Sequence, residues 1–302
     1  MSHFAVMVVG KDVEEQLEKY DEKLIYDEYD AEVRDYRIDS FKQFCKREKG
    51  IEVGDSIDEA YTYYGQEYNG NEWFKKDDGK WYEKTTYNPN SKWDWYVIGG
   101  RFSGCFFTHL TKEGKKVISS ENYGEPGVFN NDVGVDSIEK KYIDFAKIRE
   151  EAAENARDYY RYIASLFDDG VIPKIEITFN RLKEMYPNKS IEEIREIYFA
   201  QSALKKVEKA KEKDRKGENR LGFFFSLEDY QCTEDEYAES AYKEALVPFA
   251  LVKDGEWYDR GEMGWFGCVS NEMEADKWND FVNKTIEELD ENEILTIVDC
   301  HI

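Results

Sequence analysis

The chain has 302 residues, of which 41% are hydrophobic and 16% aromatic, which is enough apolar material for a packed core and excludes a disordered acidic polypeptide. The formal net charge is −24, and residues 228–302 hold 21 acidic and only 5 basic side chains. A field of this sign repels nucleic acid and disfavours a DNA-binding protein, unless the acid itself mimics DNA.

No apolar run approaches the roughly 20 residues of a membrane span, and the N-terminal residues lack the pattern of a signal peptide. The five cysteines are odd in number and widely spaced, so we expect reduced thiols. These features predict a soluble intracellular protein without a membrane partner.

The two ends of the chain carry complementary patterns. Residues 2–10, SHFAVMVVG, are typical of a strand and are followed by a short helix pattern, whereas a helix pattern at 275–289 precedes the strand-like EILTIVDCHI. We expect these terminal strands to pair in one sheet. Two Asp-Gly turns, within Glu72–Lys84 and Val247–Gly261, predict β-hairpins.

Residues 88–107, NPNSKWDWYVIGGRFSGCFF, predict an aromatic hairpin. Trp93, Trp95 and Val97 are expected on one face of a strand, with Asp94, Tyr96 and Ile98 on the other. Gly99-Gly100 supplies a turn or bulge, and RFSGCFF returns as a second strand. The segment EWYDRGEMGWFGCV repeats the pattern, which favours a core of two related hairpins; the alternative is a binding groove lined by Trp95, Arg101 and Trp265. The candidate residues are Trp93, Trp95, Tyr96, Arg101, Trp257 and Trp265.

Residues 137–217 show helical periodicity. Two series with a spacing of seven predict one long helix with a coiled-coil-like seam. A second helix is expected from Ser190, with Glu193 at capping-box spacing, and to run on to about 216. The seam must be covered by that helix or by a second copy of the chain, so we expect a homo-oligomer. The seam residues are Ile138, Tyr142, Phe145, Ala152, Ala156, Tyr159, Ile163 and Leu166.

Motifs of catalysis are absent from the sequence: it holds no GxSxG, HExxH or GxxxxGK[ST]. His3, Cys300 and His301 would come together on paired terminal strands, but Cys300 and His301 are adjacent and point to opposite faces, so a shared metal is not expected. We therefore expect no catalytic residue, no metal and no cofactor. The predicted fold is α+β, with a mixed sheet that joins both chain ends. The body comprises residues 1–136 and 221–302, and a helical arm is inserted at 137–220.

The stretches SHFAVMVVG, NPNSKWDWYVIGGRF and WFGCV resemble a group of phage-encoded proteins that begin Ser-His-Phe and carry a KWDWYxIGGR(W/F) motif. Among phage proteins the chain most resembles the Gabija anti-defence proteins, in which an α+β body carries a helical arm. The resemblance implies a non-enzymatic protein of the host cytoplasm that assembles around the Gabija nuclease-helicase complex and blocks its access to DNA. The alternatives are a sponge for a nucleotide signal, with Arg101 as phosphate partner, an acidic DNA mimic, and a phage enzyme.

Overall fold

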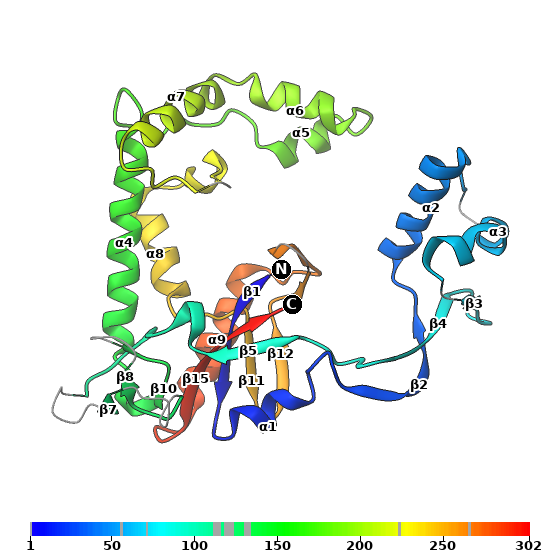
Figure 1. Ribbon diagram of the computed structural model, residues 1–302. Helices are drawn as coiled ribbons and strands as arrows, with labels where there is room; N and C mark the ends of the chain where they lie inside the picture. Colours follow the sequence, from blue (N-terminus) through cyan, green and yellow to red (C-terminus); the bar gives the residue numbers. More distant parts are fainter. Residues whose placement is uncertain are drawn as a thin grey trace.

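The computed structural model describes residues 2–54, 57–70, 72–110, 116–117, 124–129, 134–222, 225–264 and 267–302. Three parts are visible in Figure 1: a central sheet with its covering helices (the body), a chain of helices on one side (the arm), and a small sheet with two helices on the other side (the lobe). This is the α+β fold that the sequence predicts. Among the described residues, no helix combines the length and the apolar character needed to cross a membrane.

The body sheet is built on the two ends of the chain. β1 (His3–Val9) lies antiparallel to β15 (Ile294–His301) over its full length and parallel to β11 (Ala250–Lys253), which confirms a mixed sheet that joins both termini. The strand order is β10-β15-β1-β11-β12, and β5 also pairs with β15. The remaining strands are β5 (Trp95–Ile98), β10 (Ser137–Glu139) and β12 (Glu256–Asp259). The hairpin of β11 and β12 turns at Asp254-Gly255, as predicted.

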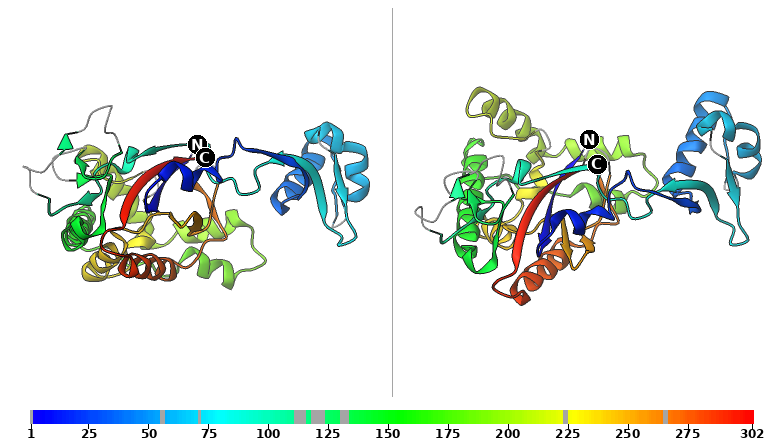
Figure 2. Two further views of the ribbon diagram at one scale, coloured as in Figure 1. Left: turned by 90° about the horizontal axis from the view of Figure 1, so that it is seen from below. Right: turned by 60° about the horizontal axis from the view of Figure 1, so that its bottom comes forward.

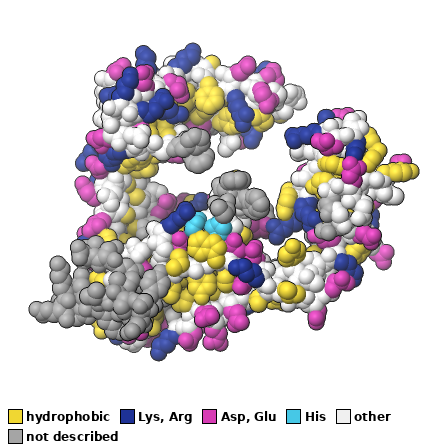
Figure 3. Space-filling view, viewed as in Figure 1, with side chains coloured by type: hydrophobic (Ala, Val, Ile, Leu, Met, Phe, Trp, Pro, Cys, Tyr) yellow, Lys and Arg dark blue, Asp and Glu magenta, His cyan; other side chains and the backbone are white. Residues whose placement is uncertain are grey.

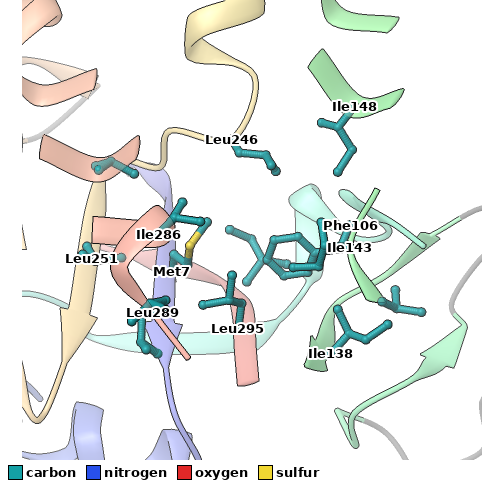
Figure 4. Packing of buried hydrophobic residues seen from close by; sticks show 14 of the residues in the cluster. Met7, Phe106, Ile138, Ile143, Ile148, Leu246, Leu251, Ile286, Leu289 and Leu295 are labelled. Atoms are coloured by element: carbon teal, nitrogen blue, oxygen red, sulfur yellow. The ribbon is translucent and has the colours of Figure 1, made fainter. Parts of the chain in front are cut away.

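Alternate residues of the central strands face two separate cores, as the two-residue period of a strand requires. Met7 and Leu295 pack on one face in a cluster that includes α9 (Ala275–Glu288), with Trp278 only 2% exposed (Figure 4). Val6 and Val298 pack on the other face against α1 (Val13–Glu18). Each neighbouring pair of residues in β1 thus contributes to both cores.

Two smaller sheets adjoin the body. One has the order β6-β9-β8-β7, and its Phe106 is fully buried in the same cluster as Met7. The other is a short antiparallel ribbon. Their strands are β6 (Phe106–Phe107), β7 (Lys116–Val117), β8 (Val128–Phe129), β9 (Gly134–Val135), β13 (Glu262–Met263) and β14 (Val269–Ser270).

The lobe has its own sheet and its own core. Its strands have the order β2-β4-β3, and the hairpin at Asp78-Gly79 is confirmed. Phe41, which is fully buried, packs against the rings of Tyr61 and Trp73. The elements are β2 (Ile25–Glu32), α2 (Asp35–Lys49), α3 (Asp58–Asn69), β3 (Trp73–Lys75) and β4 (Trp81–Tyr87). The predicted first part of the body, residues 1–136, therefore contains a separate small unit, and Figure 2 shows it projecting from the body.

The arm consists of helices that follow one another around a core of their own. The long helix α4 packs along α8 (Figure 1). The tip of the arm buries Ile163, Leu182 and Leu204 in one cluster. The capping box of Ser190 and Glu193 is present, as predicted. The elements are α4 (Phe145–Ser165), α5 (Phe179–Met185), α6 (Ile191–Phe199), α7 (Ser202–Lys216) and α8 (Glu234–Glu244).

Two predicted boundaries of the arm are wrong. The long helix begins at Phe145, because residues 137–139 form β10 in the body sheet, and the arm extends to Glu244, because α8 packs along α4. The helix predicted from Ser190 onward is broken at Gln201, which has extended backbone angles. Its side-chain amide accepts from the Ile177 N–H and donates to the Ile177 carbonyl, both at 2.8 Å, so it ties down the preceding loop instead of continuing the helix.

Candidate functional site

The segment that follows β5 is a tight turn and not the second strand of a hairpin. Gly99 and Gly100 have φ angles of 72° and 51° and lead into the 3-10 turn η1 (Gly100–Phe102). β5 pairs with β15, whereas β6 pairs with β9, so the predicted hairpin is wrong. The two strands separate because the glycines, which tolerate left-handed angles, turn the backbone around two carboxylates.

Those carboxylates are Asp136 and Asp299, which are 3% and 2% exposed. Asp136 accepts from the Gly104 N–H at 2.6 Å and Asp299 accepts from the Arg101 N–H at 3.0 Å. A Cβ atom on Gly99 would lie 2.0 Å from Asp136 Oδ2, and one on Gly100 would lie 2.5 Å from Asp299 Cβ. The glycines are therefore required by close approach as well as by backbone angle.

Two histidine–aspartate pairs lie beside this turn. His3 Nδ1 is 2.9 Å from Asp299 Oδ1, and His301 Nδ1 is 2.6 Å from Asp94 Oδ1. His3 and His301 are register partners on β1 and β15, with ring centroids 4.9 Å apart. One buried carboxylate, Asp299, thus connects the glycine turn to a histidine of the opposite strand.

The tryptophans of the motif divide between core and surface. Trp93 is 7% exposed, donates to the Leu17 carbonyl at 3.2 Å and meets the Tyr96 ring edge to face. Trp95 is 41% exposed and stacks on His301 with ring centroids 5.0 Å apart. The expected sharing of one face by Trp93 and Trp95 is wrong, because Trp93 precedes β5 and turns into the core beside α1.

Arg101 and Trp257, the other described candidate residues, have different partners from Trp95. The Arg101 side chain is exposed, and its backbone N–H holds Asp299. Trp257 lies on β12, which β15, β1 and β11 separate from β5, and it donates to Asp259 Oδ2 at 2.9 Å, so the two aromatic segments are not paired hairpins of a duplicated core. The prediction for Trp265 lies outside the described residues.

The predicted oligomer seam is divided among several elements. Ile138 belongs to strand β10 and is 1% exposed in the body core, and Tyr142 lies in a 3-10 turn before the helix, so their place in the seven-residue series is coincidental. Within α4, Ala156 and Ile163 are buried in the chain itself. Phe145 packs on the body core and Tyr159 on the arm core, with Leu166 capping the helix; Ala152 is half-buried. Most of the seam is therefore covered within the chain, and the homo-oligomer stays a prediction.

Burial controls the ionisation of several groups around the site. It raises the pKa of the Asp136 carboxyl, which the hydrogen bonds from Gly104 and Ser103 oppose, and it raises the pKa of the Tyr96 phenol. Burial also raises the pKa of the Cys300 thiol, whose side chain packs with Val298 and Phe4 on the face opposite the histidines. Cys300 is therefore a core residue and not a nucleophile.

Two of the segments from which a resemblance to phage proteins was expected meet at this site. Residues 2–10 supply His3 on β1, and residues 88–102 supply Asp94, Trp95 and the glycine turn. No family model matches the chain, and no curated protein or solved structure matches it. Asp94, Asp136 and Asp299 were not among the predicted site residues, because they stand among 66 acidic residues without a distinctive spacing.

Proposed function

We propose that this protein is a phage anti-defence protein that binds a bacterial nuclease-helicase complex of the Gabija type and blocks its DNA binding and cleavage by occlusion. The main support for this proposal is the arrangement of arm and lobe, which project on opposite sides of the body and leave an open hollow between them (Figure 3). An open surface of this width fits a macromolecule better than a small molecule, which favours enclosed pockets.

The exposed apolar side chains support a protein partner. The most exposed ones lie on the arm, on the lobe, and where β2 begins and β4 ends: Ile25 at 84%, Tyr87 at 77%, Tyr63 at 74% and Phe199 at 62%. Aromatic residues are enriched in protein interfaces and contribute much of their binding energy. Both projections thus carry exposed apolar side chains to which a protein partner could bind.

The acidic residues favour occlusion by shape over mimicry of DNA. Several carboxylates of residues 228–302 are paired within the chain, as Glu234 is with Arg161 at 2.7 Å and Glu239 is with Lys243 at 2.7 Å. The acidic residues are spread over α8, β12 and α9, which belong to both the arm and the body. A DNA mimic needs unpaired charges in one array.

The test is a DNA-cleavage assay with a purified Gabija nuclease-helicase complex. We expect inhibition that is complete at a stoichiometric ratio, together with co-elution of the two proteins in gel filtration. Tyr63→Ala and Phe199→Ala should weaken inhibition, whereas Tyr258→Ala, which changes a 42% exposed tyrosine of the body, serves as the matched control. Undiminished cleavage in the presence of excess protein, or progressive inactivation by substoichiometric protein, would contradict the proposal.

A further inference from the structure

The backbone brings His3 and His301 as close as two strands allow. Ser2 and Ile302 exchange both backbone hydrogen bonds, at 3.0 and 3.1 Å, so the adjacent pair of His3 and His301 occupies a non-hydrogen-bonded position of the antiparallel ladder. Directly opposed side chains approach most closely at such positions. The two rings, with centroids 4.9 Å apart and planes at 71°, project from the same face of the sheet.

Each ring is held through the same nitrogen. A carboxylate accepts hydrogen bonds, so Nδ1 of His3 and Nδ1 of His301 carry the protons that face Asp299 and Asp94, at 2.9 and 2.6 Å. In the neutral imidazole the lone pair is then on Nε2. This orientation, in which a carboxylate fixes the far nitrogen, is the usual support of a metal-binding histidine.

The supports are built into the fold. Asp299 is 2% exposed, accepts a hydrogen bond from the Arg101 N–H and lies close to Gly100. Trp95 stacks on the His301 ring at 18° and limits its rotation. The histidine side chains remain 14% and 6% exposed, and Figure 3 shows histidine at the surface between arm and lobe.

We infer that His3 and His301 form a two-histidine site for a divalent transition-metal ion such as Zn²⁺, with the two Nε2 atoms as ligands. Imidazole nitrogens bind Zn²⁺ at about 2.1 Å, which places two such nitrogens about 3.4 Å apart around a tetrahedral ion, within reach of rings this close. Within the described part of the chain no third His, Cys, Asp or Glu completes the set. The remaining positions take water or a donor atom of a bound molecule.

This inference does not depend on the proposed partner. Cys300, which was expected to point away from His301, packs in the core on the opposite face of the sheet and is not needed as a ligand. Asp94 and Asp299 act as positioning residues that orient the imidazoles. An ion here would leave open coordination positions on the surface between arm and lobe.

The experiment is a Zn²⁺ titration of untagged, chelator-treated full-length protein by isothermal calorimetry. We expect one saturable ion per chain, at least tenfold weaker binding in His3→Gln and His301→Gln, and weaker binding by about 10- to 100-fold in Asp94→Asn. His109→Gln is the matched control, because His109 is the third histidine of the sequence, is 61% exposed and lies near Asp144 instead. Absence of saturable binding, or binding that survives the loss of His3 or His301, overturns the inference.

A second measurement uses the unmodified protein and is independent of variant folding. Long-range nitrogen–proton NMR of the imidazoles should show His3 and His301 protonated on Nδ1 in the metal-free protein, and Zn²⁺ should shift their Nε2 resonances while leaving those of His109 in place. Nε2 resonances of His3 and His301 that do not move with Zn²⁺ overturn the inference equally.

Discussion

Replacing Gly100 by alanine should destabilise the body more than the same replacement at Gly255. Both glycines have positive φ angles, 51° and 71°, but a Cβ atom on Gly255 would meet nothing within 4 Å. A Cβ atom on Gly100 would lie 2.5 Å from Asp299 Cβ and 2.8 Å from Val97 Cγ1. The difference between the two variants therefore isolates the close approach of the turn to Asp299.

The expected magnitudes follow from two separate costs. A left-handed alanine costs about 1–2 kcal/mol, which both variants share, together with the loss of unfolded-state freedom that partly offsets it. Overpacking adds about 1–3 kcal/mol at Gly100 alone, because the nearest atoms belong to a buried aspartate and cannot swing away. Gly100→Ala should thus lose more free energy of unfolding than Gly255→Ala by about 1–3 kcal/mol.

Urea unfolding followed by circular dichroism and tryptophan fluorescence measures this difference, provided that the m-value is unchanged. Gly255 is a suitable reference because it lies in the same body, in the turn between β11 and β12. Equal free energies of unfolding for the two variants would refute the argument, since Asp299 would then yield without cost and the glycine turn would not be fitted to it.

Three further predictions concern the arm and the lobe. Burial alone would raise the pKa of Asp214, but hydrogen bonds from Tyr162, Arg220 and Leu221 hold this pKa below its usual value. The ionised carboxylate therefore stabilises the fold above about pH 4, and this contribution is lost as the pH falls further. Asp214→Asn should therefore lower the free energy of unfolding by about 1–3 kcal/mol at pH 7 and by less at pH 3, and a cost independent of pH would contradict this. Phe41→Ala should remove about 3–5 kcal/mol from the lobe, and hydrogen exchange should show lost protection in residues 25–87 only; loss that spreads through the body sheet would show that the lobe is not a separate unit. Ala238→Glu, at a fully buried position of α8, should detach α8 from α4 and expose the arm to limited proteolysis without changing the mass measured by light scattering, whereas a fall in mass would restore the seam as an interface between copies.

The parts of the fold that could be predicted are those fixed by short-range patterns. The terminal strands follow from alternation and apolar runs, the two hairpins from their Asp-Gly turns, and the start of α6 from the capping box at Ser190. Each of these signals lies within about ten residues and needs no knowledge of distant neighbours. The joining of both termini in one sheet was predicted from the strand pattern at each end of the chain, and β1 and β15 do pair.

The wrong predictions concern segments whose conformation depends on contacts with residues far away in the sequence. Gly99-Gly100 has the composition of a hairpin turn, but its conformation is fitted to Asp136 and Asp299, far away in the sequence. The seven-residue spacing from Ile138 continues into a true helix, yet Ile138 itself pairs with Leu295 in the body sheet. The two histidines were visible in the sequence, but their supporting aspartates were not, because only the folded strands bring them within hydrogen-bond distance.

The ribbon that carries the lobe has a mechanical consequence. The chain leaves and re-enters the body at one point, where Asp21 bridges Trp93, and β2 and β4 then run outward as a two-stranded ribbon (Figure 2). The side chains of its first cross-strand pair, Ile25 and Tyr87, are largely exposed, and the register shifts between Ile25 and Tyr29. Inter-strand hydrogen bonds hold β2 and β4 together, and two-stranded ribbons twist more strongly than wide sheets. We therefore expect the position of the lobe relative to the arm to depend on the twist of this ribbon and on the exposed ion pair of Arg34 with Glu262 at 3.6 Å.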